Sequence, residues 1–193
     1  MLAQADKRCL NCALQMDTQL DYCGACLRTK PPFDKAYTVF RYQNPAAYLI
    51  KQFKYHDKLF LASFFADKLK TVLKRIYPEQ IPLVLPMPLN RFRTKTRGFN
   101  QVHYLLIKAG LIKPAHAQMC VRTKPTKTLS QLSAADRKRE LKGAFRADYI
   151  QAEHILLVDD VMTTGSSFAE LTHTIKHKNP HIRQVDVLCL ARA

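Results

Sequence analysis

The feature that most constrains how this chain can fold is the segment at residues 154–167, which reads His-Ile-Leu-Leu-Val-Asp-Asp-Val-Met-Thr-Thr-Gly-Ser-Ser. Its four apolar residues, 155–158, predict a strand buried on both faces, as in parallel sheets. Two carboxylates follow, and residues 168–177 then show the apolar spacing of a helix. This order predicts an α/β fold whose loop lies at the carboxyl end of a strand, where open α/β sheets bind their ligands.

The loop between this strand and this helix combines groups that suit a sugar phosphate. Residues 163–167 offer hydroxyls, and the backbone N–H groups of a helix N-terminus favour a phosphate. Asp159 and Asp160 can accept hydrogen bonds from vicinal hydroxyls, or hold Mg²⁺ through water. We therefore predict a receptor for a sugar phosphate. The alternative is an ordinary strand-to-helix turn with acidic capping residues.

Four cysteines near the N-terminus have the spacing of a metal site. They form two Cys-x-x-Cys pairs separated by ten residues: Cys9, Cys12, Cys23 and Cys26. Four thiolates complete the tetrahedron that zinc prefers, and filling all four positions favours a structural ion that supplies folding energy. Unrelated cysteines or a redox pair are the alternatives. Gly24 lies where such a turn needs an unhindered backbone.

The cysteines and a proline-rich stretch divide the chain into two expected parts. Residues 1–32 would form the zinc module, ending at Lys30-Pro31-Pro32, and residues 33–193 would form the α/β domain. We expect Cys12→Ser to destabilise the module without altering the sugar-phosphate receptor. Cys120 and Cys189 lie in apolar contexts and are expected to be buried thiols.

Charge limits the partners of this chain. The net charge is +16, and residues 91–146 hold fourteen Lys and Arg but only two acidic residues. Such a concentration favours a polyanionic partner (nucleic acid, a pyrophosphate-bearing substrate, or both) over the alternative of a solvated basic surface. With no apolar run long enough for a membrane span or signal peptide, we expect a cytoplasmic protein without membrane insertion, its cysteines reduced or metal-bound.

Two basic segments are candidates for contact with that polyanion. One follows a proline-bounded apolar run and contains Arg91, Arg93, Lys95 and Arg97. We predict that it clamps a pyrophosphate, because an Arg fork engages two phosphate oxygens at once; a solvated loop is the alternative. The other, residues 126–140, includes a capping-box pattern at 133–136 and is either a lid over the site or a surface excursion.

The remaining pattern completes an alternating fold. Apolar periodicity and proline positions predict strands at residues 36–42, 81–89, 115–122 and 182–190, with helices at 45–55, 59–76 and 101–109. No segment is obviously rich in base-stacking aromatics, although Tyr37, Phe40 and Tyr42 could line a base site.

The segment at 154–167 resembles the phosphoribosyl-pyrophosphate (PRPP) motif of type I phosphoribosyltransferases. By that resemblance Asp159 and Asp160 contact the ribose 2′- and 3′-hydroxyls and are candidate catalytic residues, and residues 163–167 wrap the 5′-phosphate. Some purine-using members carry an acidic residue where this chain has Thr163, and that residue can act as an acid or base toward the nucleobase. This chain lacks a carboxylate at that position. The full candidate binding set is Asp159, Asp160, Val161, Met162, Thr163, Thr164, Gly165, Ser166 and Ser167.

Nearly the whole chain resembles the ComF/ComFC competence family, which joins a zinc-finger module to a phosphoribosyltransferase-like domain. The resemblance rests on the cysteine pairs, Lys51-x-x-Lys54-Tyr55, Pro86-x-Pro88, Arg97-Gly98-Phe99-Asn100-Gln101, Arg137, Gly143-Ala144-Phe145 and the motif at 159–167. It implies a mostly parallel, doubly wound sheet, Mg²⁺ bound with PRPP, and a role in natural transformation. It also implies single-stranded DNA, a helicase-like protein and recombination factors as partners.

Two functions remain open from the sequence. One is a DNA-binding competence protein that keeps a PRPP or ribose-5-phosphate pocket. The other is an active Mg²⁺-dependent phosphoribosyltransferase acting on an unidentified base, in which positioning and charge stabilisation displace pyrophosphate.

Overall fold

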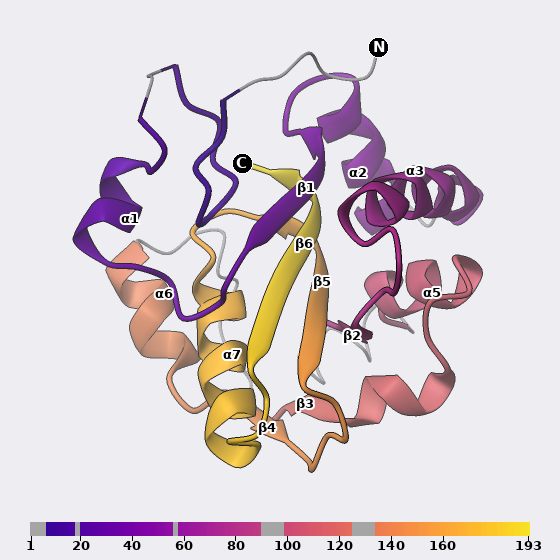
Figure 1. Ribbon diagram of the computed structural model, residues 1–193. Coiled ribbons are helices and arrows are strands. Elements are labelled where there is room, and N and C mark those ends of the chain that lie inside the picture. Colours follow the sequence, from indigo (N-terminus) through magenta and orange to yellow (C-terminus); the bar gives the residue numbers. More distant parts are fainter. Residues whose placement is uncertain (1–6, 18–19, 56–57, 90–98, 125–133) are drawn as a thin grey trace.

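A four-stranded parallel sheet forms the centre of the molecule (Figure 1). The computed structural model describes residues 7–17, 20–55, 58–89, 99–124 and 134–193. The sheet order is β1-β6-β5-β2, and every neighbouring pair is parallel. The strands are β1 (Ala36–Arg41), β2 (Leu83–Pro86), β5 (His154–Met162) and β6 (Gln184–Arg192).

Helices cover both faces of this sheet, as the near-continuous apolar runs of its central strands require. On one face Leu69 and Leu73 of α3 (Leu61–Ile76) and Leu106 of α5 (Gln101–Lys108) pack against Leu156 and Val158 of β5. On the other face α7 (Ser166–Lys178) packs against Ile155 and Leu157. Since successive residues of β5 point to opposite sides, the predicted double burial is confirmed.

Smaller elements surround this core. They are α1 (Gly24–Arg28), α2 (Ala46–Tyr55), α6 (Ala134–Leu141), the 3₁₀-helix η1 (Pro114–Gln118), β3 (Cys120–Arg122) and β4 (Phe145–Ala147). β3 and β4 form a separate two-stranded antiparallel sheet. The predicted α/β class with a mostly parallel sheet is therefore confirmed.

One predicted strand is largely wrong. Residues 115–122 were expected to be extended, but most of that segment is the 3₁₀-helix η1, and only its end forms β3. Pro114 occupies the first turn of η1, where its fixed φ favours a helical start. Arg91, Arg93, Lys95 and Arg97, and the first part of the expected lid at 126–140, lie outside the described residues.

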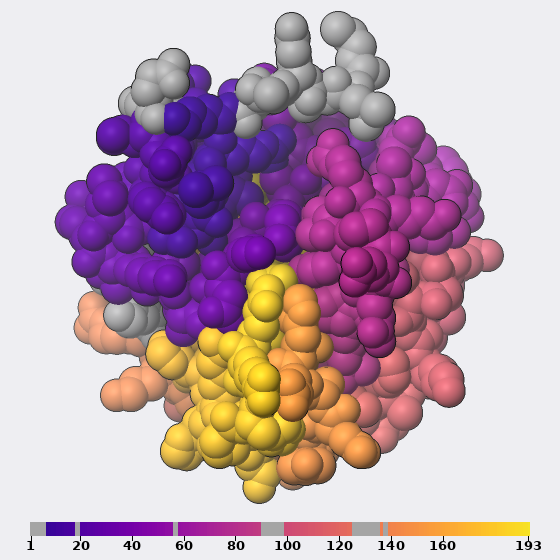
Figure 2. Space-filling view, viewed as in Figure 1, coloured from indigo at the N-terminus to yellow at the C-terminus, as the bar shows by residue number. Residues whose placement is uncertain are grey.

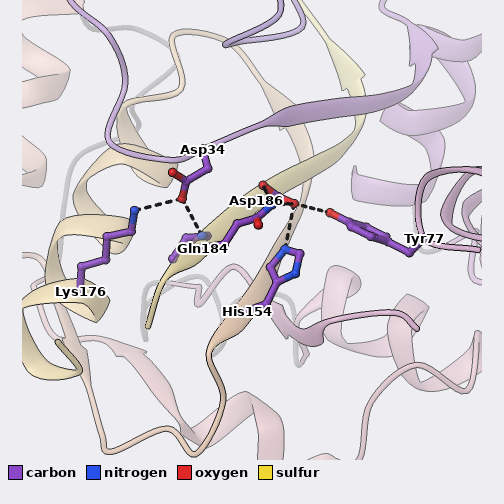
Figure 3. A network of polar contacts seen from close by, with 7 residues as sticks. Asp34, Tyr77, His154, Lys176, Gln184 and Asp186 are labelled. Atoms are coloured by element: carbon purple, nitrogen blue, oxygen red, sulfur yellow. Dashed lines mark hydrogen bonds and ion pairs between the residues drawn. The ribbon is translucent and has the colours of Figure 1, made fainter. Parts of the chain in front are cut away.

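A polar network joins the elements at the amino ends of the strands (Figure 3). The buried Asp186 carboxylate accepts a hydrogen bond from Tyr77 at 2.6 Å and lies 2.9 Å from His154 Nε2. Burial, the hydrogen bond to Asp186 and its charge raise the pKa of the Tyr77 hydroxyl. Asp34 accepts from Lys176 at 3.0 Å and from the Val185 N–H at 2.8 Å. These bonds fix the end of the sheet that lies away from the motif at 159–167.

Among the described residues, every helix is too short or too polar to cross a membrane.

Candidate functional site

A pocket of about 270 Å³ lies at the carboxyl ends of β2 and β5. The chain leaves β2 toward α5 on one face of the sheet, whereas it leaves β5 toward α7 on the opposite face. Adjacent strands whose connections diverge in this way open a crevice, which is where α/β sheets bind ligands. The pocket contains the whole predicted set, residues 159–167, together with side chains from α2 and from the segment after β2.

The acidic pair belongs to the strand rather than to a loop after it. β5 continues to Met162, and Asp159 is paired with Cys189 of β6. Asp159 accepts a hydrogen bond from the Asp160 N–H at 2.8 Å, and Asp160 accepts one from the Val161 N–H at 2.6 Å. Both carboxylates are thus held in place by the backbone before any ligand arrives.

Lys54 is the counter-charge of this pair, and sequence reasoning assigned it no role. Its Nζ lies 2.8 Å from Oδ1 and 2.6 Å from Oδ2 of Asp160, and both side chains are largely buried. The Lys54–Asp160 pair joins α2 to β5 across 106 residues of sequence. The Lys51-x-x-Lys54 spacing was the available signal, because it places both lysines near one side of a helix, and both line the pocket.

Burial and charge shift the protonation of these groups. Burial raises the pKa of Asp159 to about 7, the charge of Asp160 acts in the same direction, and Lys54 opposes both. Burial alone would lower the pKa of the Lys54 ammonium, but the charges of Asp160 and Asp159 outweigh it and raise that pKa. The pocket therefore holds a firmly charged lysine beside a carboxyl group that titrates near neutral pH.

The loop after the acidic pair has the geometry of an anion site. Gly165 has a φ of 75°, which favours glycine, and it is the N-cap of α7 without supplying a side-chain cap to the helix. The hydroxyls of Thr164 and Ser166 lie 2.8 Å apart. Because α7 is 13 residues long, its N-terminal N–H groups and these hydroxyls can together receive a phosphate.

A neighbouring wall of the pocket is held by a helix cap. Asn100 accepts hydrogen bonds from the N–H groups of Val102 and His103, and its side-chain amide donates to the Met87 carbonyl at 3.0 Å. Met87, with Pro88 and Leu89, lines the pocket. The predicted family string at 97–101 thus contributes a residue that fixes the segment after β2.

Sequence reasoning found only part of the aromatic and basic lining. Tyr42 lines the pocket as expected, but Tyr37 packs against Tyr77 and Phe40 stacks on Phe64 instead. Two further lining residues were missed, Tyr55 and Arg122. The guanidinium of Arg122 lies 5.5 Å from the ring centre of Phe145 in β4, a strand that the sequence did not indicate.

The four predicted zinc ligands come together in the fold. The four Sγ atoms all lie within 4.8 Å of one another, and those of Cys12 and Cys23 are 3.6 Å apart. The four residues are Cys9, Cys12, Cys23 and Cys26. Tetrahedral Zn–S bonds of about 2.3 Å require sulfurs about 3.8 Å apart, so the cluster fits zinc. The cluster can therefore hold a structural zinc ion.

Backbone hydrogen bonds favour a thiolate at Cys9, whereas burial and the neighbouring sulfurs oppose a thiolate at Cys26. Burial raises the pKa of Cys9, but backbone hydrogen bonds from Cys23, Cys12 and Asn11 outweigh it and lower that pKa to about 7. Burial and the neighbouring sulfurs raise the pKa of Cys26. A bound cation would offset the cost of ionising these thiols.

The expectation that Gly24 provides an unhindered backbone at a metal-binding turn is wrong. Gly24 is the first residue of α1, and a Cβ there would meet only Arg28, at 3.8 Å. The residue of this segment with a left-handed backbone is Ala13, with φ 57°.

Comparison with known proteins identifies the family. The chain is 31% identical to Competence protein F of Haemophilus influenzae over 96% of its own length and 84% of that protein. It is 35% identical to the DNA utilization protein YhgH of Escherichia coli, over 94% of the chain and 83% of YhgH. Competence protein ComFC of Bacillus subtilis is 24% identical over 67% of the chain and 53% of ComFC. The chain matches no family profile. On the extent of these similarities, the chain belongs to the ComF/ComFC family of competence proteins.

Proposed function

We propose that this protein is a competence or DNA utilization factor whose pocket binds PRPP, or a related ribose 5-phosphate, together with Mg²⁺. The observation that best supports this proposal is that the Asp159–Asp160 pair and the hydroxyl-lined N-terminus of α7 lie in one pocket. The carboxylates suit the ribose 2′- and 3′-hydroxyls or water-bridged Mg²⁺, and the helix N-terminus suits the 5′-phosphate. The basic segment from Arg91 to Arg97 is the candidate for contact with the pyrophosphate.

The same protein is proposed to bind single-stranded DNA. A net charge of +16 provides the attraction to the phosphate backbone. On α2, Tyr48, Lys51 and Tyr55 lie at i, i+3 and i+7 and are all exposed, the tyrosines by 57% and 59%. These two rings are separated by about 10 Å along the helix, so two unpaired bases could stack on them while Lys51 contacts a phosphate.

The setting of this function is also part of the proposal. Reduced cysteines and a structural zinc ion fit a cytoplasmic protein, and a role in natural transformation would place it beside helicase-like and recombination proteins. The names of the relatives, Competence protein F and DNA utilization protein YhgH, support this setting.

Isothermal titration of PRPP with Mg²⁺ tests the pocket. The wild type should bind with a single site, and Asp159→Asn/Asp160→Asn should weaken binding at least tenfold, because two acceptors for the ribose hydroxyls lose their charge. Asp67→Asn, at a carboxylate whose side chain is 75% exposed, is the control and should bind like the wild type. Absence of PRPP binding by the folded wild type would refute the pocket assignment.

Fluorescence anisotropy with a labelled oligonucleotide tests the DNA surface. Tyr48→Ala should weaken single-stranded DNA binding about fivefold to a hundredfold, the usual effect of losing one stacking ring. Tyr149→Ala, which removes another exposed tyrosine, should have no effect. Binding should fall with salt and survive Asp159→Asn/Asp160→Asn, because this change leaves Tyr48, Lys51 and Tyr55 in place. Equal loss in the Tyr48 and Tyr149 variants would contradict the proposed surface.

An active transferase is the second candidate, and one observation favours it. Besides the acidic pair, the pocket contains the cations Lys51, Lys54 and Arg122, which could stabilise charge on a departing pyrophosphate. Release of pyrophosphate from PRPP in the presence of a nucleobase would support this function. PRPP binding without release, across the common bases, would favour the binding protein.

A further inference from the structure

The side chain of Arg192 connects the cysteine cluster to the phosphate loop. Arg192 is the last residue of β6 and pairs with Met162 at the end of β5. Its Nε donates to the Cys12 carbonyl at 3.2 Å, and its Nη1 donates to the Met162 carbonyl at 3.2 Å. Nη1 also donates to the carbonyls of Thr163 and Ala193. One guanidinium thus holds a metal-ligand residue and the first residues of the loop together.

Apolar contacts strengthen this connection. Phe33 packs edge-on against Phe168, the third residue of α7, with ring centres 6.4 Å apart. A Cβ on Gly165 would lie 3.7 Å from the Phe33 ring, so that ring closes one side of the loop. Ala13, one residue after Cys12, is buried in the same core as Phe33 and Met162. Figure 2 shows the N-terminal residues, in indigo, packed directly on the rest of the molecule.

A zinc ion bound at the cysteine cluster would help to fix the position of the Cys12 carbonyl. The buried core of the cysteine segment consists of Cys9, Cys12 and Cys23, with a few partly buried neighbours. A core this small does not order a segment by itself, so zinc would supply the ordering energy. Without zinc, Arg192 would lose one of its fixed acceptors and the loop would lose a rigid support.

We propose that Arg192 is a positioning residue through which zinc at the cysteine cluster holds the loop at 163–167 in its phosphate-binding geometry. The identity of the ligand that the loop binds rests on the proposed function. The connection from the zinc cluster through Arg192 to the loop does not. The planar fork of arginine suits this role because it presents several donors in fixed directions to several carbonyls. The expectation that Cys12→Ser leaves the receptor unaltered is replaced by its opposite: losing a metal ligand weakens phosphate binding.

Hydrogen exchange measured by NMR or mass spectrometry on the full chain tests the link without any ligand. Chelation of zinc should raise exchange of the Ala169 and Ala193 amides, which donate to the Gly165 and Met162 carbonyls at the loop, about tenfold, and Arg192→Met should do the same with zinc bound. Chelation should then cause little further increase in amide exchange in the Arg192→Met variant, because both changes remove the same connection. Amides at 185–188, in the buried part of β6, should keep their protection. Arg183→Met removes an exposed arginine that pairs with Glu153, and should leave the loop unchanged.

Titration of PRPP with Mg²⁺ provides the second readout. Arg192→Met should weaken binding several-fold, and Arg192→Lys, which keeps the charge and one donor nitrogen, should restore part of it. Unchanged loop exchange after zinc removal would overturn the link, as would a rise in exchange across all of β6. If wild-type protein binds no PRPP, the proposed function fails, while the exchange experiment still decides the link.

Discussion

At the scale of single residues, the pocket depends on a balance between two carboxylates and one lysine. Asp159 and Asp160 are adjacent in sequence, so their mutual repulsion was foreseeable, but their counter-charge was not. Lys54 comes from a helix 106 residues away and reaches Asp160 only through the fold. A spacing pattern identifies residues that share a helix face, whereas an ion pair between distant segments requires the tertiary arrangement.

Lys54→Met should destabilise the protein because it leaves two largely buried carboxylates without their cation. We expect a loss of about 3 kcal/mol in the free energy of unfolding, the lower end for broken buried pairs. Urea denaturation at pH 7.5 measures it. Lys51→Met is the matched control, since Lys51 lies on the same helix but is exposed, and it should change stability by less than about 0.5 kcal/mol. Equal effects of the two substitutions would show that the ion pair contributes nothing.

Asp159→Asn should stabilise the protein at high pH but not at low pH. The folded pKa of Asp159 is about 7, above the ordinary value of 3.8, so its contribution is fully present below pH 4 and lost as pH rises through 7. An amide avoids this loss, and we expect a gain of about 2 kcal/mol at pH 8 that shrinks toward zero at pH 4.5. Thermal unfolding of both proteins across this range checks it. A difference that does not change with pH would contradict the raised pKa.

At the scale of secondary-structure elements, strong periodicity made most predictions correct. The apolar runs and proline positions anticipated β1, β2, β5 and β6 and the helices α2, α3, α5 and α7. The elements that the sequence did not predict correctly are short or polar. β4 has three residues and is defined by its pairing with β3, and β5 continues through the acidic pair because β6 supplies its partners. Pairing with a neighbouring strand overrode what these local sequences indicated.

Asn100→Ala should weaken α5 and the pocket wall together. It removes an N-cap that accepts two N–H groups and a donor to the Met87 carbonyl. We expect a loss of about 1–2 kcal/mol in unfolding free energy, as for other N-caps. Chemical denaturation measures this loss, and Asn100→Asp should recover only the part that comes from the cap, because a carboxylate accepts from the two N–H groups but cannot donate to the Met87 carbonyl. No recovery by Asp would assign the loss to the bond with Met87 instead.

At the scale of the whole molecule, topology brings two distant motifs together. The cysteine pairs and the motif at 159–167 were both recognisable in the sequence, and each was expected to act alone. The parallel order β1-β6-β5-β2 brings the C-terminal strand between them, so that Arg192 contacts Cys12 and Met162 at once. This relation depends on strand order, which no local pattern encodes. The division into residues 1–32 and 33–193 stays a prediction.

A crystal structure of the protein with Mg²⁺ and PRPP would show directly whether the pocket at the ends of β2 and β5 binds this ligand. We expect the ribose hydroxyls within hydrogen-bond distance of Asp159 and Asp160, and the 5′-phosphate on the backbone N–H groups and hydroxyls of residues 163–167. The Lys54–Asp160 pair and the sheet should keep their positions. PRPP bound elsewhere, or this pocket still empty at saturating PRPP, would refute the proposed PRPP site.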